Sequence, residues 1–302
     1  MIAPARAMDN RQALRHGMAS LRSANVPSHT LAAELLLMHV LGHDRTWIYT
    51  HPEKPLDPSD VNRYFALIER RAAGEPTQYL TGKQEFWGLE FEVTPAVLIP
   101  RPETEHAVEV VLERLGERGI KINTLTGAPR PMLRIADLGT GSGCLAVVLA
   151  HELLHAQVVA TDISAAALEV GRRNSERHKV ADRVQFIQSD LLEAVGSATP
   201  FDVIVSNPPY VAREEADQLP REVREHEPGA ALFGGPSGFE MYGRLIKQAG
   251  GLLRSGGILV LELGYNSLDH VHGLLYGPPA WVNVSVTIDL AGIPRVIVAQ
   301  RA

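Results

Sequence analysis

The stretch that decides the fold reads Ile135-Ala136-Asp137-Leu138-Gly139-Thr140-Gly141-Ser142-Gly143-Cys144, an apolar strand that runs into a glycine-rich turn. The apolar run that follows is typical of a helix, so the turn places backbone amides at a helix N-terminus, where glycine lets a ligand approach closely. The spacing is G-x-G-x-G, whereas the dinucleotide fingerprint needs glycine or alanine where Cys144 stands. We therefore expect a ligand site at this loop and disfavour a nicotinamide or flavin enzyme.

Short apolar segments alternate with amphipathic helical segments from this strand to the C-terminus. Strands are expected at 133–137, 158–162, 184–188, 202–206, 258–263, 282–288 and 295–299. Such alternation predicts an α/β domain in which a largely parallel sheet is covered on both faces. Its ligand should lie at the C-terminal ends of the strands. A helix at about 103–118 and a glycine- and proline-containing loop at 127–129 precede the first strand.

The N-terminal quarter has a different pattern, with turn signals separating segments of helical period. Pro27-Ser28 opens a helix that is apolar on most sides and so central to a small bundle, and Asp57 is expected to cap a helix that starts at Pro58. Residues 83–93 predict a β-hairpin turning near Gly88. We expect a helical domain over 1–74, a linker with the hairpin over 75–100 and the α/β domain over 101–302.

Composition sets the class of protein and excludes several others. The 302 residues are 45% hydrophobic and 21% charged, which is typical of a soluble globular protein. A single cysteine, Cys144, excludes an intrachain disulfide and a cysteine-built zinc site. His39 and His43 have metal-ligand spacing but no recognisable third ligand, so we predict no metal. With no apolar run long enough to cross a bilayer and no signal-peptide core, we expect a cytoplasmic protein.

Acidic residues follow the next two predicted strands, as Asp137 ends the first. Asp162 ends the second strand, where a carboxylate can accept both hydroxyl protons of a ribose. Asp190 follows the third strand, where it can meet an adenine amino group while Leu191 covers the ring. One strand-ending aspartate is commonly a helix cap. Three in succession beside a glycine loop favour the binding of a nucleoside without phosphate.

The fourth predicted strand runs directly into Ser206-Asn207-Pro208-Pro209-Tyr210. The two prolines have fixed φ and donate no backbone hydrogen bond. The side-chain oxygen of Asn207 and the carbonyl of Pro208 can therefore stand as rigid acceptors that suit a planar amino group. Tyr210 supplies a ring face on which a flat group can stack.

These ordered motifs resemble the S-adenosylmethionine-dependent methyltransferases of class I, and Asn-Pro-Pro-Tyr after the fourth strand resembles the motif of those that act on amino or amide nitrogens. Further stretches narrow the resemblance to the HemK/PrmC family, the release-factor glutamine N5-methyltransferases. They are Pro76-Thr77-Gln78-Tyr79-Leu80-Thr81-Gly82, Glu85-Phe86-Trp87-Gly88-Leu89, Leu98-Ile99-Pro100-Arg101-Pro102-Glu103-Thr104-Glu105, Glu227-Pro228-Gly229-Ala230-Ala231-Leu232 and Glu262-Leu263-Gly264. The resemblance covers about Gly74 to the C-terminus.

The resemblance implies a seven-stranded Rossmann-like class I methyltransferase domain with a small N-terminal helical bundle and a β-hairpin linker. It implies transfer of a methyl group from S-adenosyl-L-methionine to the side-chain nitrogen of the glutamine in a release factor's Gly-Gly-Gln motif. The implied cofactor contacts are Gly139, Thr140, Gly141, Ser142, Gly143, Asp162, Asp190, Leu191 and Asn207. Asn207 and Pro208 would be catalytic, and Asn207, Pro208, Pro209 and Tyr210 would hold the substrate glutamine.

Three alternatives stay open at this point. A nucleic-acid amino N-methyltransferase shares Asn-Pro-Pro-Tyr, but residues 75–302 hold 20 basic and 28 acidic residues, which argues against a basic groove. A sister branch methylates a glutamine of a ribosomal protein, and residues 100–105 favour release factors over it. The third is a noncatalytic nucleoside-binding module. We expect release factors as partners, no direct nucleic-acid or membrane partner, a monomer, and substrate recognition by residues 1–74, which hold nine basic and seven acidic residues.

Overall fold

The computed structural model describes residues 8–117, 132–196, 199–277 and 280–302, so the predicted loop at 127–129 lies outside it. The chain divides into two compact units. The first runs to Lys83 and also includes Pro220–His226, and the second comprises Gln84–Leu219 and Glu227–Ala302. Each unit has its own hydrophobic core. The division into 1–74, 75–100 and 101–302 stays a prediction.

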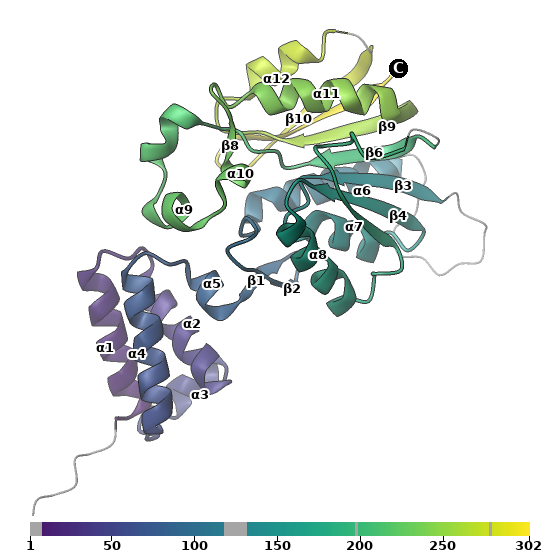
Figure 1. The fold of residues 1–302 in the computed structure, drawn as a ribbon. Coiled ribbons are helices and arrows are strands. Elements are labelled where there is room, and N and C mark those ends of the chain that lie inside the picture. The colour runs from purple at the N-terminus through teal and green to yellow at the C-terminus, as the bar shows by residue number, and fades with distance from the viewer. Residues whose placement is uncertain (1–7, 118–131, 197–198, 278–279) are drawn as a thin grey trace, which may run out of the picture. The chain divides into compact units, whose positions relative to one another are not determined.

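The first unit is a helical bundle. Its helices are α1 (Asn10–Ser23), α2 (His29–Leu41), α3 (Arg45–Thr50), α4 (Pro58–Ala72), α5 (Thr77–Thr81) and α9 (Arg221–His226). The apolar helix α2 contacts α1, α3, α4 and α5, as its sequence predicts for a central helix, and α1, α2 and α4 lie side by side (Figure 1). Buried Ala33, Leu36, Leu37 and Tyr64 fill the space between them.

Three local features of this unit differ from the sequence prediction. Asp57 precedes α4, but its side chain makes no capping hydrogen bond, so the fixed φ of Pro58 sets the helix start instead. The short helix α5 was not predicted, because five residues after a proline show too little periodicity. Helix α9 joins this unit from far along the chain, where Glu222 forms an ion pair with the buried Arg71.

The hairpin is formed by β1 (Lys83–Phe86) and β2 (Leu89–Glu92), as predicted. Its turn residues Trp87 and Gly88 both have positive φ, 56° and 70°, which two-residue hairpin turns of type I′ require. Phe86 and Phe91 are buried in the core of the second unit. The Trp87 backbone N–H donates to the Glu105 carboxylate at 2.8 Å, which ties the turn to the following helix.

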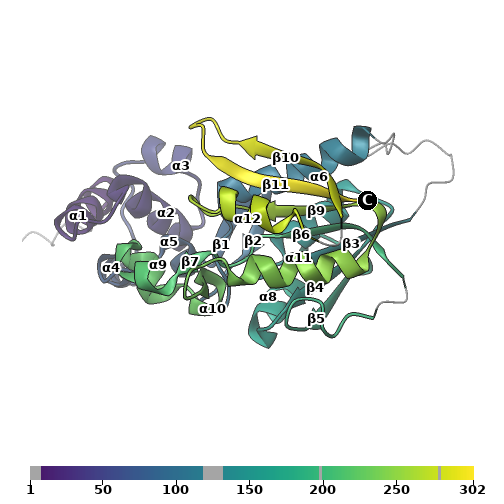
Figure 2. The same ribbon diagram turned by 90° about the horizontal axis from the view of Figure 1, so that it is seen from above.

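The second unit is built on one seven-stranded sheet, which confirms the predicted strands. These are β3 (Leu133–Leu138), β4 (Ala156–Asp162), β5 (Val184–Gln188), β6 (Phe201–Ser206), β9 (Leu253–Glu262), β10 (Trp281–Ile288) and β11 (Pro294–Arg301). The order across the sheet is β10-β11-β9-β6-β3-β4-β5, with β11 antiparallel to both neighbours and the other pairs parallel (Figure 2). Strand β9 begins five residues earlier than expected, because Gly256-Gly257 indicates a turn but forms an irregularity opposite β6.

Helices cover both faces of this sheet (Figure 1). One face packs on α6 (Glu105–Glu117), α7 (Cys144–Glu152) and α8 (Ala165–Arg177), and the other on α11 (Glu240–Leu252) and α12 (Leu268–Leu274). Side chains alternate along β3 accordingly: Ile135 lies in the first core, whereas Ala136 and Leu138 lie in the second. Short elements fill the connections, namely η1 (Pro102–Thr104), β7 (Val211–Ala212), η2 (Arg213–Gln218), α10 (Gly229–Leu232) and β8 (Phe233–Gly235).

The strand order reverses between β3 and β6. From β3 the chain proceeds to β4 and β5 on one side, and from β6 it proceeds to β9 on the other. A crevice forms at such a switch point, outside the C-terminal ends of the strands. The glycine turn after β3 and the Asn207 segment after β6 are therefore brought together by topology.

Candidate active site

A cavity of about 300 Å³ lies at this switch point. Its wall includes Gly139 and Gly141 after β3, Asp162 after β4, Asp190 and Leu191 after β5, and Asn207, Pro208 and Pro209 after β6. Ala96, Val97 and Leu98 from the segment after the hairpin, with Ala230, Ala231 and Met241, complete much of the rest. Apolar atoms dominate the surface, as they do in small-molecule sites.

The glycine turn leaves room for a ligand. Gly139 and Gly141 have φ of 69° and 54°, and a Cβ at either position would meet no described atom within 4 Å. Gly143 serves packing instead, because a Cβ there would come within 3.1 Å of the Gly171 Cα on α8. The turn is therefore open on the cavity side and closely packed behind.

Asp137, the last polar residue of β3, contacts the residues of the glycine turn; the sequence places it at a strand end but predicts no ligand contact for it. Its buried carboxyl accepts hydrogen bonds from the Thr140 hydroxyl at 2.6 Å and from the Ala146 backbone N–H at 3.1 Å. Loss of hydration on burial raises the pKa of Asp137 to about 7. The group is thus close to its midpoint at neutral pH.

We expect this carboxyl to make stability depend on pH. Between about pH 4 and 7, Asp137 holds a proton in the folded protein that it has lost in the unfolded chain. Its contribution to the free energy of unfolding is therefore complete below about pH 4 and is lost as the pH rises through 7. The loss is at most about 1.4 kcal/mol per pH unit. Urea unfolding of wild type and Asp137→Asn measures it. The wild-type advantage should shrink between about pH 5 and pH 8; an advantage independent of pH would contradict the prediction.

Asp162 ends β4 and faces the cavity. Its two carboxylate oxygens accept hydrogen bonds from the backbone N–H groups of Gly141 and Ser164, both at 2.9 Å. Carboxylate oxygens have further lone pairs for a ligand. The residue therefore holds the glycine turn in place while its charge faces the cavity.

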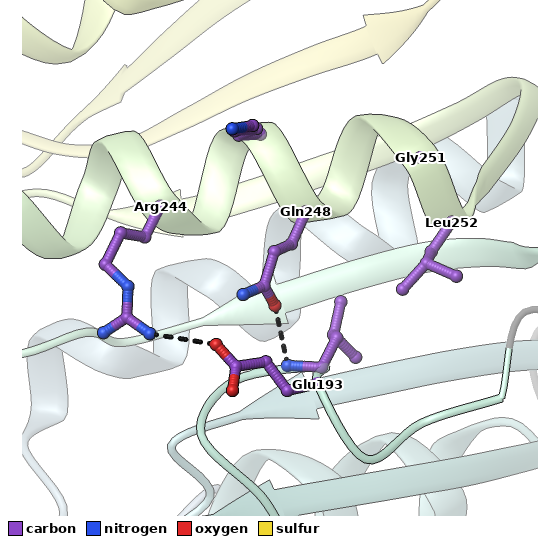
Figure 3. A pocket seen from close by; sticks show the side chains of 7 residues that line it. Glu193, Arg244, Gln248, Gly251 and Leu252 are labelled. Atoms are coloured by element: carbon purple, nitrogen blue, oxygen red, sulfur yellow. Dashed lines mark hydrogen bonds and ion pairs between the residues drawn. The ribbon is translucent and has the colours of Figure 1, made fainter.

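Helix α11 holds the turn that contains Asp190 and Leu191, and Figure 3 shows Arg244 of this helix paired with Glu193, which follows the turn. Arg244 pairs with Asp190 at 2.7 Å and with Glu193 at 3.3 Å, and the Gln248 side-chain oxygen accepts from the Leu192 backbone N–H at 2.9 Å. Leu191 has φ of 52°, unusual for a leucine, and such strain persists where surrounding contacts impose it. The contacts to α11 thus keep Leu191 against the cavity.

The segment 206–210 after β6, here called the acceptor segment, is held by hydrogen bonds of Ser206 and Asn207. The Ser206 hydroxyl donates to the Leu138 carbonyl at 2.7 Å, which joins the end of β6 to the end of β3. The Asn207 Nδ2 donates to the Thr104 hydroxyl at 3.1 Å. With its nitrogen engaged in this way, the Asn207 side chain has its oxygen left to accept a hydrogen bond, and its role as an acceptor for the substrate stays a prediction.

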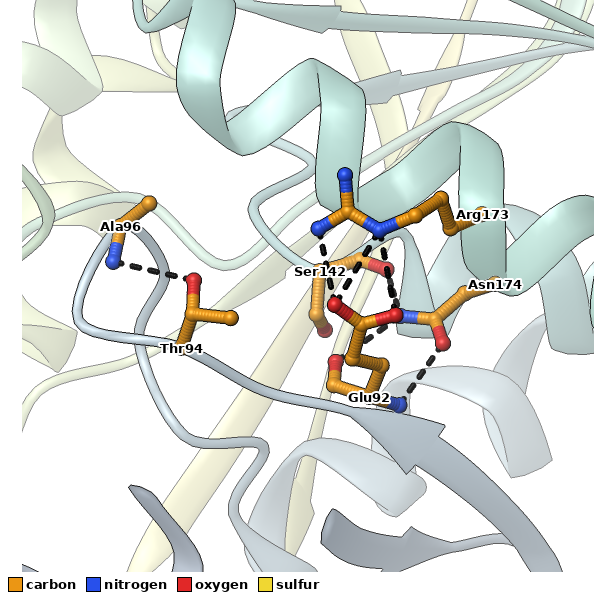
Figure 4. Close-up of polar contacts among 6 residues, drawn as sticks. All are labelled: Glu92, Thr94, Ala96, Ser142, Arg173 and Asn174. Carbon is orange, nitrogen blue, oxygen red and sulfur yellow. Dashed lines mark hydrogen bonds and ion pairs between the residues drawn. The ribbon is translucent and has the colours of Figure 1, made fainter. Parts of the chain in front are cut away.

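Asn174 on α8 joins two walls of the site (Figure 4). Its buried side chain accepts from the Glu92 backbone N–H at 2.7 Å and donates to the carbonyls of Glu92 and Ser142 at 3.0 and 2.9 Å. Arg173 adds an ion pair to Glu92 at 2.8 Å. The segment that carries Ala96–Leu98 is thereby fixed relative to the glycine turn.

We expect Asn174→Ala to lower the free energy of unfolding by about 1 to 3 kcal/mol, because it leaves buried backbone groups without partners. Denaturant titration measures the loss. Asn62→Ala removes an exposed asparagine from α4 and should change stability by less than about 0.5 kcal/mol. Equal stabilities of the two variants would show that the Asn174 bonds contribute nothing net.

Four predicted site residues are not among the described residues that line the cavity. Thr140 and Ser142 are buried, with the Thr140 hydroxyl bonded to Asp137, and Gly143 packs on α8. The Tyr210 ring packs near Gly264, where an added Cβ would lie 2.8 Å from it. Ligand contacts of these four residues stay predictions.

The side chains of Cys144 and His43 take part in packing. Burial raises the pKa of the Cys144 thiol to about 12, and the side chain packs against the core. His43 stacks on Trp47 with ring centroids 3.7 Å apart. Among the residues that the structure describes, no three histidine, cysteine or acidic side chains are grouped to hold a metal ion. None of the described helices is long and apolar enough to cross a membrane.

Sequence reasoning missed Asp137, Thr104, Arg244 and the Ala96–Leu98 wall as site residues. Thr104, Leu98 and the Ala230-Ala231 pair do lie within the stretches on which the family resemblance depends. Their position in those stretches was the sequence signal that could have identified them as site residues. Contacts over more than a hundred residues, such as that of Thr104 with Asn207, have no local sequence pattern.

Comparison with known families assigns both parts of the chain. The PrmC N-terminal domain model matches residues 12–82, and the methyltransferase small domain model matches residues 122–223. The release factor glutamine methyltransferase of Koribacter versatilis is 44% identical over 97% of this chain and 99% of that protein. That of Moorella thermoacetica is 43% identical over the same shares.

Solved structures share the fold at low sequence identity. The hMettl16 catalytic domain in complex with MAT2A 3'UTR hairpin 6 has a TM-score of 0.55 at 18% identity, covering 78% of this chain and 81% of that one. A methyltransferase from Pyrococcus furiosus has a TM-score of 0.50 at 20% identity, covering 79% and 98%. At these identities the likeness supports the class I methyltransferase fold alone.

Proposed function

This chain belongs to the release factor glutamine methyltransferases, and on that premise we propose that it transfers a methyl group from S-adenosylmethionine to the side-chain nitrogen of a release-factor glutamine. The glutamine would be that of the Gly-Gly-Gln motif. The observation that carries the proposal is that Asn207 and Pro208 line the same cavity as Gly139 and Asp162. One cavity would thus bind the nucleoside at Gly139 and Asp162 and the substrate amide at Asn207 and Pro208.

The cavity suits S-adenosylmethionine by its donors and acceptors. Asp162 would accept the ribose hydroxyls, and Asp190 would meet the adenine amino group with Leu191 against the ring. Among the described residues that line the cavity, the basic one is Arg244, and it is paired with Asp190, so this part of the wall offers no free cation for a phosphate. Gly139 and Gly141 leave the open space that a ligand next to the backbone needs. When bound, this cofactor supplies an electrophilic methyl group on a positively charged sulfur.

The residues after β6 would prepare the glutamine amide to react. An amide nitrogen is a poor nucleophile because its lone pair is delocalised into the carbonyl. The Asn207 side-chain oxygen and the Pro208 carbonyl would accept both N–H bonds of the amide and direct the nitrogen toward the methyl carbon. They would also stabilise the positive charge that builds on the nitrogen during transfer.

No strong base is needed in this account. The carbon–nitrogen bond forms as the carbon–sulfur bond breaks, and the N-methylated amide then loses one proton to solvent. We assign no role as a base to Glu103 or Glu105 at the start of α6. Glu103 approaches Arg295, and Glu105 accepts a hydrogen bond from the Trp87 backbone N–H. Their place at a helix start is also favoured by the helix dipole.

The helical residues 1–74 would recognise the release factor, because a single glutamine offers few contacts and discrimination needs a remote surface. The enzyme would act as a monomer in the cytoplasm, where release factors work, without contacting nucleic acid or a membrane.

Mass spectrometry of a release factor after incubation with this protein and isotopically labelled S-adenosylmethionine tests the function. We expect one labelled methyl group on the glutamine of Gly-Gly-Gln and none on a release factor in which that glutamine is alanine. Label on another residue, on a ribosomal protein alone or on nucleic acid would contradict the proposal.

A further inference from the structure

A buried carboxyl that the reaction scheme does not use lies behind the acceptor segment. Glu262 ends β9, next to β6, and only 2% of the residue is exposed. It accepts a hydrogen bond from Thr104, while its Oε2 has no partner among the described residues. Burial raises its pKa to about 7. A buried carboxyl is costly to maintain, so its position calls for a physical explanation.

The charged groups around Glu262 are engaged elsewhere. Arg101 pairs with the buried Glu227, and Arg295 pairs with Asp289 at 2.7 Å and approaches Glu103 at 4.0 Å. The hydroxyl of Tyr242 donates to the Glu262 backbone carbonyl at 2.9 Å rather than to its side chain. Tyr210 faces the same region, and burial raises the pKa of its hydroxyl. Among the residues that the structure describes, Thr104 is thus the side chain that is hydrogen-bonded to the carboxyl.

Thr104 lies between this carboxyl and Asn207. Its hydroxyl accepts from the Asn207 Nδ2 at 3.1 Å and donates its one hydrogen to Glu262. In its ionised form, which predominates above about pH 7, Glu262 can only accept, so the hydroxyl hydrogen then points toward Glu262. The hydroxyl then has only lone pairs to offer Asn207, which must present its nitrogen. When Glu262 is ionised, it therefore sets the direction of both hydrogen bonds, from Asn207 to Thr104 and from Thr104 to Glu262.

We propose that Glu262 and Thr104 are positioning residues for methyl transfer, which fix the Asn207 amide so that its oxygen, and not its nitrogen, faces the substrate nitrogen. This inference rests on the proposed function, because it assigns the freed oxygen to the glutamine amide. An asparagine without this constraint could flip and present N–H groups to the substrate N–H groups. A flipped Asn207 would repel the amide that it should align.

The experiment compares Thr104→Val with Thr104→Ser in the full-length enzyme. Valine keeps the shape but removes the hydroxyl, and we expect kcat for release-factor methylation to fall about tenfold, the effect of losing about 1.4 kcal/mol of alignment. The KM for the release factor and the cofactor Kd from calorimetry should stay within about twofold. Serine restores the hydroxyl and should bring kcat back to within about threefold of wild type.

Thr161→Val is the matched control for loss of a buried threonine hydroxyl. Thr161 is fully buried in β4, and its hydroxyl has no hydrogen-bond partner among the described residues. We expect this variant to methylate release factor like wild type. A Thr104→Val enzyme as active as Thr161→Val would overturn the positioning role, as would a Thr104→Ser enzyme as slow as Thr104→Val.

The single variant Glu262→Gln tests whether Glu262 orients the Thr104 hydroxyl, and it does not require Thr104→Val to fold. A glutamine side chain can either accept from or donate to Thr104, so it no longer sets the direction, and kcat should fall at constant cofactor Kd. In the double variant with Thr104→Val, it should cause no further fall. Multiplying effects would show that Glu262 acts independently of Thr104. If wild type itself leaves release factor unmethylated, the proposed function fails rather than this inference.

Discussion

Replacing Asn207 by alanine lowers kcat for release-factor methylation by about 100-fold or more, because the reacting nitrogen loses an acceptor that aligns it at the moment of transfer. The fold should survive, since within the described part of the chain the side chain makes one hydrogen bond, to Thr104, and the flanking Ser206 and Pro208 remain. Most of the cofactor affinity should survive as well, because the Gly139 and Asp162 walls are unchanged. Chemistry should fail before binding.

Single-turnover kinetics with saturating release factor separate these quantities. Calorimetry of the same preparation gives the cofactor Kd, and Asn62→Ala on the surface of α4 is the control for an asparagine-to-alanine change. A kcat within about threefold of wild type would contradict the alignment role. An equal loss of cofactor affinity would show that Asn207 acts in binding the cofactor rather than in aligning the substrate amide.

Replacing Asp162 by alanine weakens S-adenosylmethionine binding by about 10- to 150-fold, the equivalent of about 1.5 to 3 kcal/mol for charge-assisted hydrogen bonds. The structure adds a second reason for a large effect. The same carboxylate accepts from the Gly141 backbone N–H, so its loss also frees the glycine turn. Isothermal titration calorimetry measures the Kd directly.

Asp202→Ala is the matched control for this change. Asp202 is also a strand aspartate that accepts a backbone hydrogen bond, from Arg134 at 2.7 Å, but it lies at the beginning of β6, at the opposite end of the strands from the cavity. We expect it to cost stability and leave the cofactor Kd unchanged. Wild-type affinity in Asp162→Ala would refute the ribose assignment, and equal losses in both variants would reduce it to a general effect of destabilisation.

Much of the fold is determined by local patterns in the sequence. The seven strands follow from short apolar segments between amphipathic helices, and their bounds differ from prediction by a few residues, apart from the earlier start of β9. Strand ends also fix one edge for Gly139, Asp162, Asp190 and Asn207, because parallel strands share their direction. The hairpin turn at Trp87-Gly88 is equally local, since only two residues must adopt positive φ.

The tertiary structure alone decided the features that depend on burial and on distant contacts. Asp137 and Glu262 have raised pKa values because packing removes water from them, and no spacing rule states that. Thr104 meets Asn207 across 103 positions of sequence, and Glu222 reaches Arg71 across 151. The sequence by itself therefore determined which groups stand at the strand ends, since periodicity is local. Which of them are braced, aligned or shielded was decided by packing, since hydration and hydrogen-bond direction depend on every neighbour in space.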